Sequence, residues 1–576
     1  MKLLSLHCDY IKYEAGKKAL KTAELEKGQE GKHEIKEPLV ILTAVEKGDN
    51  SSSVLEYVKN IKDIASQVKA KKIVIYPYAH LSSQLASPDI AVSLLREAES
   101  LLKKEFEVTR APFGFYKEFE LKCKGHPLAE LSREIGSGLN INIIKDKAGS
   151  KELVVEEKYD AKQLLNQIAR TKLDTSKLKD NDHRILGMKM DLFSFHDTAP
   201  GMCFWHNNGW ILFNELVNFW RDEHRKAGYQ EISTPQILDK KLWQISGHWE
   251  KYKENIFLSK YEGRDFAVKP MNCPGGMLVY KASPKSYKEL HLRVAELGVV
   301  HRQELSGVLA GLFRVIRITQ DDAHIFCADE SQIEQEIEGV IKMINLFYKK
   351  FNLIFDHVEL STRPEKRIGT DAIWDMAEGI LEKVLKKNKM KYKINKGDGA
   401  FYGPKIDFHI KDSQSRTWQL STIQLDFAMP ERFALEYTDK DNKIKQPIML
   451  HRVIYGSLER FIGILLEHMN GKLPTWLSPI QVRIINFTDR NTEACKKLIK
   501  QLEEKIPNLR VDADFRNDTV QSKIRDAEIL RVPNIIVIGD KEESSKSLAL
   551  RKHGKVSSIK IDKFIEELAE EIRERK

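Results

Sequence analysis

A chain of 576 residues with 41% hydrophobic side chains is long enough for about three or four domains, each with its own core. Lysine and arginine (94) outnumber aspartate and glutamate (84), and the resulting net charge of +10 permits contact with nucleic acid without requiring it. No stretch reaches the ~18 uninterrupted apolar residues of a membrane span, and the first apolar run is too short for a signal peptide. The six cysteines form no CxxC pair, which argues against a disulfide framework and favours a cytoplasmic location.

Residues 1–142 are expected to form a compact α/β unit. Alternating and helical apolar spacings define its elements. The predicted elements are strands over 2–8, 39–45, 72–76 and 115–122 and helices over 54–68 and 90–104. The stretch 16–36, rich in Lys, Glu and Gly, predicts a loop or a frayed element.

Residues 143–185 change in character and are expected to be a linker. The stretch 145–157 is polar and charged, and residues 161–169 have the pattern of a short amphipathic helix. This change of composition separates the first unit from the next.

Residues 186–477 form the largest predicted unit. A long helix is expected over 210–226, and the strand after it stops at Pro235. Residues 299–318 predict two antiparallel strands joined by a long turn-prone loop, with the returning strand starting at Phe313. A further strand over 446–451 precedes a helix that opens near Gly456.

Arg302, Glu304 and Arg314 lie on the two arms of this predicted ribbon. A solvated surface ribbon is the commoner origin of an isolated Arg/Glu set. The polar run Gln320–His324 at the far end of the same ribbon favours a functional site instead.

These residues resemble motif 2 of class II aminoacyl-tRNA synthetases, which carries Arg-x-Glu, a variable loop and a second Arg. The resemblance implies that Arg302 holds the α-phosphate of ATP with its Mg²⁺, that Glu304 reads the adenine amino group and that Arg314 takes the other phosphates or the tRNA end. Guanidinium groups suit the negative phosphorus centre of this reaction. The helix, strand and Pro235 resemble motif 1, which builds the homodimer interface, and the turn before Arg460 resembles motif 3, in which that arginine contacts the γ-phosphate.

Cys273, His324 and His451 are far apart in the sequence, and buried residues of these types are usually structural. They match the positions at which threonyl-tRNA synthetases hold zinc, and three protein ligands leave one coordination position open, as in functional zinc sites. The resemblance also implies amino-acid contacts from Gln320, Asp322, Tyr402 and Gln424. Gln419 is implied at the ATP site, and Lys405 is a looser candidate.

Zinc that binds both the amino and the hydroxyl group of threonine would exclude valine. Serine lacks only a methyl group, a difference of about 1–3 kcal/mol, so a second hydrolytic site is expected. Residues 77–86 and 111–134 resemble the archaeal-type editing domain of this family, which is similar in fold to D-aminoacyl-tRNA deacylases. The resemblance implies that the pocket is lined by His80, Tyr116, Lys117 and Glu130. Without it, a lone histidine or an edge-strand lysine would more often be structural or solvated.

Residues 478–576 alternate strand and helix and predict a small α/β domain. It resembles the anticodon-binding domain of several class II synthetases. The resemblance implies contacts with tRNA bases, which arginines stack on and whose edges polar groups bind. The implied residues are Asn517, Arg525, Arg531, Glu542 and Arg551. A basic solvated surface is the alternative.

The expected fold is therefore multidomain, α/β and α+β, with a deacylase-like editing domain, a class II antiparallel-sheet catalytic domain and an α/β anticodon-binding domain. The implied activity is threonine–tRNA ligation with hydrolysis of mischarged seryl-tRNA. Two alternatives stay open: a class II synthetase for another amino acid, and a synthetase-like regulator that binds tRNA without catalysis. The intact Arg302, Glu304, Arg314 and Arg460 disfavour the second alternative.

Overall fold

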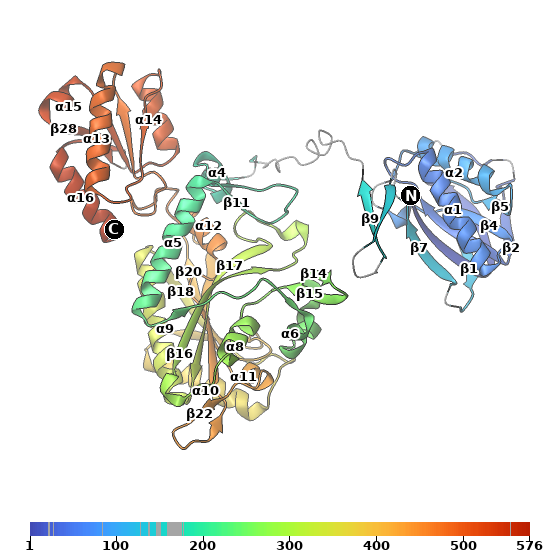
Figure 1. The fold of residues 1–576 in the computed structure, drawn as a ribbon, viewed down its shortest axis with the longest axis horizontal. Coiled ribbons are helices and arrows are strands. Elements are labelled where there is room, and N and C mark those ends of the chain that lie inside the picture. The colour runs from blue at the N-terminus through green and yellow to red at the C-terminus, as the bar shows by residue number, and fades with distance from the viewer. Residues whose placement is uncertain are drawn as a thin grey trace. The chain divides into compact units, whose positions relative to one another are not determined.

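The computed structural model describes residues 1–145 except 21–22, 27, 83–84, 127 and 136–138, and then 151–157, 175–176, 178–552 and 554–576. The chain divides into two compact units, Met1–Gln167 and Ile168–Lys576 (Figure 1). The helix predicted over 161–169 lies outside the described residues. No helix in the described ranges is long and apolar enough to cross a membrane.

The first unit is built in the following order: β1 (Lys2–Lys18), β2 (Lys32–Lys36), β3 (Pro38–Ala44), α1 (Ser51–Val68), β4 (Lys72–Pro77), η1 (Ala79–Leu81), α2 (Pro88–Leu102), β5 (Glu107–Arg110), β6 (Phe115–Cys123), β7 (Glu130–Glu134), β8 (Leu139–Lys145) and β9 (Lys151–Glu157). The predicted helices and strands of this unit are confirmed. The loop expected over 16–36 is confirmed only in part, because β1 runs to Lys18 and β2 starts at Lys32. The predicted linker begins inside the antiparallel pair β8–β9.

The long strand β1 joins two parts of this unit. Its first half pairs with β3 and β7, and its second half pairs with β2 and β6. The strands β3, β4 and β5 run parallel. The helices α1 and α2 lie together on one face of the sheet (Figure 1), where Val54, Ile61 and Leu95 join its core. A second core on the other face contains Ile11 and Tyr76.

The larger part of the second unit runs from α4 to α12. Its elements are α4 (His183–Lys189), β10 (Phe193–Ser194), β11 (Phe204–Trp205), α5 (Asn207–Lys226), β12 (Gln230–Glu231), β13 (Ile237–Asp239), α6 (Lys240–Ile245), α7 (His248–Tyr252), η2 (Lys253–Asn255), β14 (Leu258–Tyr261), β15 (Arg264–Val268), α8 (Cys273–Lys281), η3 (Tyr287–Glu289), β16 (Leu292–His301), η4 (Ser306–Val308), β17 (Arg317–Cys327), α9 (Glu330–Lys350), β18 (Ile354–Ser361), α10 (Asp371–Lys387), β19 (Tyr392–Asn395), β20 (Lys405–Lys411), β21 (Thr417–Asp426), α11 (Ala428–Arg432), β22 (Tyr437–Thr438), β23 (Ile444–Lys445), β24 (Ile448–Val453) and α12 (Leu458–His468).

Its main sheet has the strand order β12-β16-β17-β24-β21-β20-β18-β19. The central pairs are antiparallel, from β16–β17 to β18–β20. The apolar sides of α5, α9 and α10 are buried in one core with one face of this sheet. The α8 helix, with Met277 at its centre, belongs to a separate core that includes Val294 and Phe326. The sheet face opposite the core with α5, α9 and α10 therefore has polar residues that can line a site.

The predicted helix over 210–226 is confirmed as α5, and the predicted strand 446–451 corresponds to β24. Two strand predictions differ from the structure. The strand expected before Pro235 shrinks to β12, and the returning strand of the ribbon starts at Arg317, so Phe313 to Ile316 belong to the loop. The loop is held there because the Ile316 N–H donates to the Gly201 carbonyl at 2.7 Å.

The last part contains β25 (Val482–Asn486), η5 (Asp489–Asn491), α13 (Thr492–Lys505), β26 (Val511–Asp514), α14 (Val520–Ile529), β27 (Asn534–Ile538), α15 (Asp540–Ser545), β28 (Ser547–Lys552), β29 (Lys555–Lys560) and α16 (Ile561–Arg573). The sheet order is β26-β25-β27-β28-β29. The predicted alternation of strands and helices is confirmed, and the hairpin β28–β29 adds an edge that the sequence did not suggest.

Candidate active site and a second cavity

The polar run on β17 is divided between the two faces of the main sheet. Thr319, Asp321 and Ala323 are buried on the core side, and the alternate residues face the other way. Asp321 accepts hydrogen bonds from the N–H groups of Ile454 and Tyr455 at 2.9 and 3.0 Å, so it fixes the turn between β24 and α12. Asp321 is therefore a structural residue, and only its alternate neighbours can reach a ligand.

A cavity of about 130 Å³ opens on the polar face. The structure brings all four predicted amino-acid contacts to it, together with Arg302, Cys273 and His451. The lining residues are Met271, Cys273, Arg302, Gln320, Asp322, Tyr402, Thr422, Gln424, His451, Arg452 and Val453. They come from β17, β21, β24, α8 and the intervening loops, so the sheet is what collects them.

The three predicted metal ligands also converge. One donor atom each of Cys273, His324 and His451 lies within 4.8 Å of the others, and all three residues are buried. His324 and His451 face each other across the β17–β24 pair. His451 Nε2 lies 2.8 Å from Asp426 Oδ2, the carboxylate–histidine arrangement common behind metal-binding imidazoles.

The donor set fits a zinc-type cation. Within the described part of the chain, His324 Nε2 is buried without a hydrogen-bond partner. Burial lowers the pKa of His324 to about 4 and raises the pKa of the Cys273 thiol well above its usual value, because charged forms are poorly solvated there. A divalent cation would bind the neutral imidazoles and favour the thiolate.

Arg302, Arg314 and Arg460 converge beside this cavity. Arg460 donates from Nε to the Phe313 carbonyl at 2.9 Å, and Arg302 donates from Nε to the Pro270 carbonyl at 3.1 Å. Burial lowers the pKa of Arg460, and the nearby Arg314 and Arg302 guanidinium groups lower it further. Three neighbouring cations repel each other, so the arrangement is suited to an anion.

Glu304 already has a partner in this structure. The Arg314 guanidinium donates to Glu304 Oε2 from Nε at 3.1 Å and from Nη2 at 2.8 Å. Gln419, by contrast, does not line the cavity. Its side chain donates to Asp407 Oδ1 at 2.6 Å, and Lys405 lies 2.8 Å from the other oxygen of Asp407. The roles predicted for Gln419 and Lys405 stay predictions.

A buried ion pair behind the cavity escaped the sequence analysis. Lys269 Nζ lies 2.9 Å from Glu296 Oε1 and donates to Thr234 Oγ1 at 2.8 Å. The Lys269 carbonyl also accepts a hydrogen bond from the His301 N–H at 3.0 Å. The ion pair and this backbone hydrogen bond together hold the segment that carries Met271 and Cys273 against β16. A lysine directly after the apolar run Phe266–Val268 and a glutamate inside β16 were the available signals.

Thr422 and Arg452 were also missed as cavity residues. Thr422 is two positions from Gln424 on β21, so strand alternation alone would have placed it on the same face. Arg452 is almost fully buried, with its guanidinium 4.4 Å from the Tyr229 ring centroid. The predicted ligand His451 did not point to Arg452 as a cavity residue, because adjacent residues of a strand are expected on opposite faces.

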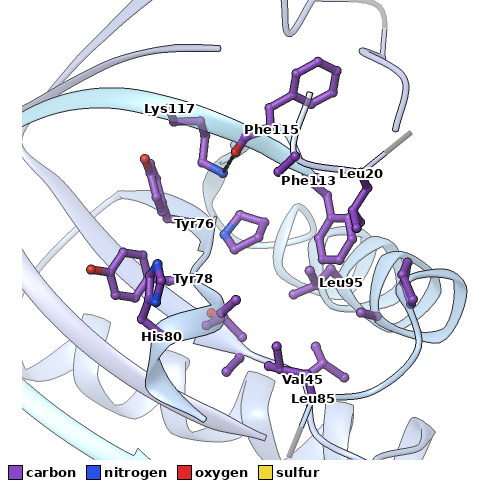
Figure 2. Close-up of a pocket in the computed structure, with 18 of the residues that line it drawn as sticks. Leu20, Val45, Tyr76, Tyr78, His80, Leu85, Leu95, Phe113, Phe115 and Lys117 are labelled. Atoms are coloured by element: carbon purple, nitrogen blue, oxygen red, sulfur yellow. Dashed lines mark hydrogen bonds between the residues drawn. The ribbon is translucent and has the colours of Figure 1, made fainter. Parts of the chain in front are cut away.

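The first unit holds a larger cavity of about 570 Å³, lined by His80, Tyr116 and Lys117 among others. Figure 2 shows Lys117 and His80 approaching it from different elements, with Tyr76 between them. Lys117 Nζ donates to the carbonyl groups of Pro112 and Phe115 at 2.9 and 3.3 Å. Burial lowers the pKa of Lys117 to about 8.

Glu130 is not among the residues that line this cavity. It lies on β7 and its carboxylate is close enough to Cys123 to raise the pKa of that thiol, an effect to which burial contributes most. The structure therefore groups three of the four predicted editing residues. The fourth lies elsewhere on the sheet, because Glu130 pairs with Leu6 of β1 whereas Lys117 pairs with Ala15.

The five residues implied in anticodon binding have separate environments. Asn517 is exposed just before α14, and Arg525 is exposed in the middle of it. Arg551 donates to Glu528 at 3.1 Å, and Glu542 accepts from the Gly539 N–H at the start of α15. Arg531 follows α14. Their role toward tRNA stays a prediction.

Comparison with known families follows this division of the chain. Residues 1–135 match the archaea-specific editing domain of threonyl-tRNA synthetase, residues 256–469 match the class II tRNA synthetase core domain (G, H, P, S and T), and residues 481–574 match an anticodon-binding domain. The match of residues 256–469 to the class II core domain identifies the class of protein as a class II aminoacyl-tRNA synthetase.

The individual relatives are more specific. The chain is 53% identical over 396 residues to a threonine–tRNA ligase of Caldanaerobacter subterraneus and 52% identical over 397 residues to one of Desulforamulus reducens. The two alignments cover 68% and 69% of this chain. These matches span 61% and 62% of the length of the relatives.

Two solved structures agree. The RNA-binding domain of threonyl-tRNA synthetase from Cryptosporidium parvum is 39% identical, with a TM-score of 0.65 over 67% of this chain and 98% of that one. A protein of Aeropyrum pernix assigned as a threonyl-tRNA synthetase is 28% identical, with a TM-score of 0.61 over 68% and 96% of the two chains. The chain belongs to the threonyl-tRNA synthetase family.

Proposed function

We propose that this protein is a threonine–tRNA ligase. A carboxylate oxygen of threonine attacks the α-phosphorus of Mg-ATP and pyrophosphate leaves. A ribose hydroxyl of the terminal adenosine of tRNA(Thr) then attacks the carbonyl carbon of the threonyl-adenylate, and AMP leaves. The observation that carries the proposal is the cavity on the polar sheet face, where Asp322 and Gln424 meet Arg302 and the Cys273, His324 and His451 donors.

The amino-acid end of the cavity is selective through its own polar groups. We assign the Asp322 carboxylate to accept hydrogen bonds from the amino group of threonine, and Tyr402 and Gln424, which line the same cavity, to limit the space around the side chain. Gln424 is itself held by its donation to the Gly403 carbonyl at 3.1 Å. Zinc held by Cys273, His324 and His451 supplies a Lewis-acidic position that prefers a substrate with a hydroxyl group.

The arginines serve the nucleotide end. Arg302 is assigned to the α-phosphate and Arg460 to the γ-phosphate, and their fixed hydrogen bonds to the carbonyl groups of Pro270 and Phe313 hold them in place before ATP arrives. Glu304 and Arg314 pair with each other in this structure, so ATP must exchange that ion pair for contacts with adenine and phosphate.

The first unit is proposed to remove serine that is attached in error. Serine keeps the hydroxyl group and lacks one methyl group, which an amino-acid pocket separates by only about 1–3 kcal/mol. The cavity lined by His80, Tyr116 and Lys117 is large enough for an aminoacyl-adenosine end and carries a buried amine. Glu130, which does not line this cavity, is a further candidate.

The remaining assignments follow the same reasoning. We propose an editing domain over 1–142, a linker over 143–185, a catalytic domain over 186–477 and an anticodon-binding domain over 478–576. Homodimerisation through α5 and β12 and a cytoplasmic location are part of the proposal. Support for the anticodon role comes from the family match over residues 481–574.

Amino-acid-dependent exchange of pyrophosphate into ATP tests this function. Threonine should support the fastest exchange, serine a slower one, and valine and proline none above background. Cys273→Ser should lose threonine-dependent exchange and, by elemental analysis, its bound zinc. Exchange that is fastest with proline or valine, or full activity in a zinc-free protein, would contradict the proposal.

A further inference from the structure

A second group of metal-ligating side chains lies outside the cavity, on β18 and β20. His357 and Glu359 are two positions apart on β18, so they share one face of the strand. His409 on β20 is the direct cross-strand partner of His357. None of the three lines the proposed active-site cavity.

The donor atoms of these residues converge. One atom each of His357, Glu359 and His409 lies within 4.8 Å of the others. His357 Nε2 is 3.1 Å from Glu359 Oε1, and His409 Nε2 is 3.7 Å from Glu359 Oε2. Ligand atoms around a tetrahedral zinc ion are about 3.4 Å apart. The donor spacing therefore suits one shared ion, and the two imidazole rings, stacked at an interplanar angle of 9°, must tilt so that both Nε2 atoms point to it.

The contacts behind the donors have the form found at metal sites. His357 Nδ1 lies 2.9 Å from Asp356 Oδ2, and the Thr417 hydroxyl donates to the same oxygen at 2.9 Å. The carboxylate thus holds the proton on Nδ1 and leaves the Nε2 lone pair facing Glu359. Asn395 donates to Glu359 Oε2 at 2.9 Å, which fixes the second carboxylate.

The strongest indication comes from His409. Its Nε2 is buried and, in the part of the chain that the structure describes, has no hydrogen-bond partner. A buried nitrogen of this kind normally has a partner. An ion-pair network without metal accounts for His357, which would lie as an imidazolium between Asp356 and Glu359. In such a network His409 Nε2 is 3.7 Å from Glu359 Oε2, too long for a hydrogen bond, and the His409 ring stacks on that of His357 with centroids 4.3 Å apart.

We propose that His357, Glu359 and His409 bind a divalent cation of the zinc type. Two imidazoles and one carboxylate favour zinc over magnesium or calcium, which prefer oxygen ligands. The side chains are 23%, 21% and 16% exposed, so an ion can enter and retains a position for water or an exchangeable ligand.

The site would join β18, the strand next to the edge strand β19, to β20. It would lie on the face of the sheet that also carries Asp407 and its partner Gln419. Asp407 and His409 alternate on β20 with Ile406, Phe408 and Ile410, which are fully buried in the core. The ion would therefore lie on the polar face and share no ligand with the Cys273 group.

Zinc and cobalt binding to the full chain tests the proposal. Metal-free protein titrated with Zn²⁺ should bind one ion that Cys273→Ser removes and another that His357→Gln or His409→Gln removes. With Co²⁺, the thiolate charge-transfer band should depend on Cys273 alone, and the two histidine variants should lose only visible bands without changing that near-ultraviolet band. Asp356→Asn should weaken the second ion by about 10–100-fold, because it changes a supporting contact and not a ligand.

His468→Gln is the matched control, since this histidine at the end of α12 belongs to no metal-ligating group of the described residues. It should retain both ions. Far-ultraviolet circular dichroism confirms that each variant is folded, and Asp356→Asn keeps the test valid where a ligand variant does not fold. The proposal is overturned if no zinc binds beyond the Cys273-dependent ion, or if the second ion binds equally well in both histidine variants and in Asp356→Asn.

Discussion

At the scale of single residues, Lys117 has an uncommon protonation range. Its pKa of about 8 means that the side chain is cationic below about pH 8 and neutral above it. In the proposed editing reaction the ammonium stabilises the negative charge that develops on the ester carbonyl. Hydrolysis of seryl-tRNA, corrected for the spontaneous reaction, should therefore fall as the pH rises through about 8. Lys117→Met should lose roughly 10²–10³-fold of the rate and the pH dependence with it.

The matched control for this prediction is Lys122→Met on the same strand. Lys122 is mostly exposed and pairs with Asp9 at 3.1 Å, so its removal should leave both the rate and the pH profile unchanged. An enzymatic rate that increases with pH through this range would show that the neutral amine acts as a base, and the electrostatic role would be wrong.

Lys269 gives a prediction about stability. Its ion pair with Glu296 is buried, with side chains 1% and 5% exposed. Lys269→Met leaves the Glu296 carboxylate buried without its cation and should cost about 3–5 kcal/mol of unfolding free energy. All eight tryptophans lie in Ile168–Lys576, so urea unfolding followed by tryptophan fluorescence reports on this unit alone. The double variant Lys269→Met/Glu296→Gln should recover part of the loss, and a loss as large as in the single variant would argue against an unpaired charge as the cause.

The residue scale also shows what the sequence could and could not reveal. Cys273, His324 and His451 have no informative spacing, and only the family resemblance grouped them before the structure did. Their meeting depends on the register of β17 against β24, which pairs residues more than a hundred positions apart. The second group was invisible for the same reason, because His357 and His409 become neighbours only when β18 pairs with β20.

At the scale of elements, α4 supports the loop between β16 and β17. His183, the first residue of α4, is buried, and its Nδ1 lies 2.7 Å from Glu467 Oε1. Its Nε2 accepts a hydrogen bond from the Leu312 N–H at 3.0 Å, and its ring lies 4.1 Å from that of Phe313. Phe313 in turn accepts from Arg460. His183 is thus a positioning residue for the loop that carries Arg314.

His183→Ala should raise the KM for ATP in threonine-dependent exchange by more than the KM for threonine. The arginines proposed to bind the nucleotide lose their support, whereas the proposed amino-acid contacts on β17 and β21 do not. His183→Gln, which can still bind Glu467 or Leu312, should recover part of the effect. Met188→Ala on the same helix changes a side chain that is 59% exposed and should behave as wild type. Equal increases in both KM values would indicate a general loss of folding instead.

Long elements were predictable because their periodicity persists over several turns, as in α5. The short strand β12 and the true start of β17 were not, because hydrogen bonds from other parts of the chain set these boundaries. Gly311 illustrates the point: it adopts φ +54°, and a Cβ there would lie 2.4 Å from His183 Nε2. The loop therefore stays close to α4 and cannot extend the strand from Phe313, a constraint that local propensity does not contain.

At the scale of the whole molecule, the proposed editing and ligation activities fall in different compact units, Met1–Gln167 and Ile168–Lys576. All three arginines of the proposed ATP site and the three proposed metal ligands Cys273, His324 and His451 belong to the second unit. The large cavity with Lys117 belongs entirely to the first. Synthesis should therefore not depend on residues 1–142, whereas correction of serine errors should.

A chain that lacks residues 1–142 should still attach threonine to tRNA(Thr) and should also accumulate seryl-tRNA when serine is supplied. The full chain should accumulate none, because serine that passes the amino-acid pocket is hydrolysed in the first unit. Lys117→Met in the full chain should accumulate seryl-tRNA as well, and it retains every residue of the second unit, which separates lost editing from damage by truncation. Product analysis by acid gel electrophoresis with labelled tRNA measures both esters. Seryl-tRNA that stays absent in both variants, with threonine attachment intact, would mean that the first unit is not the serine-editing site and that selection rests on the pocket around Asp322.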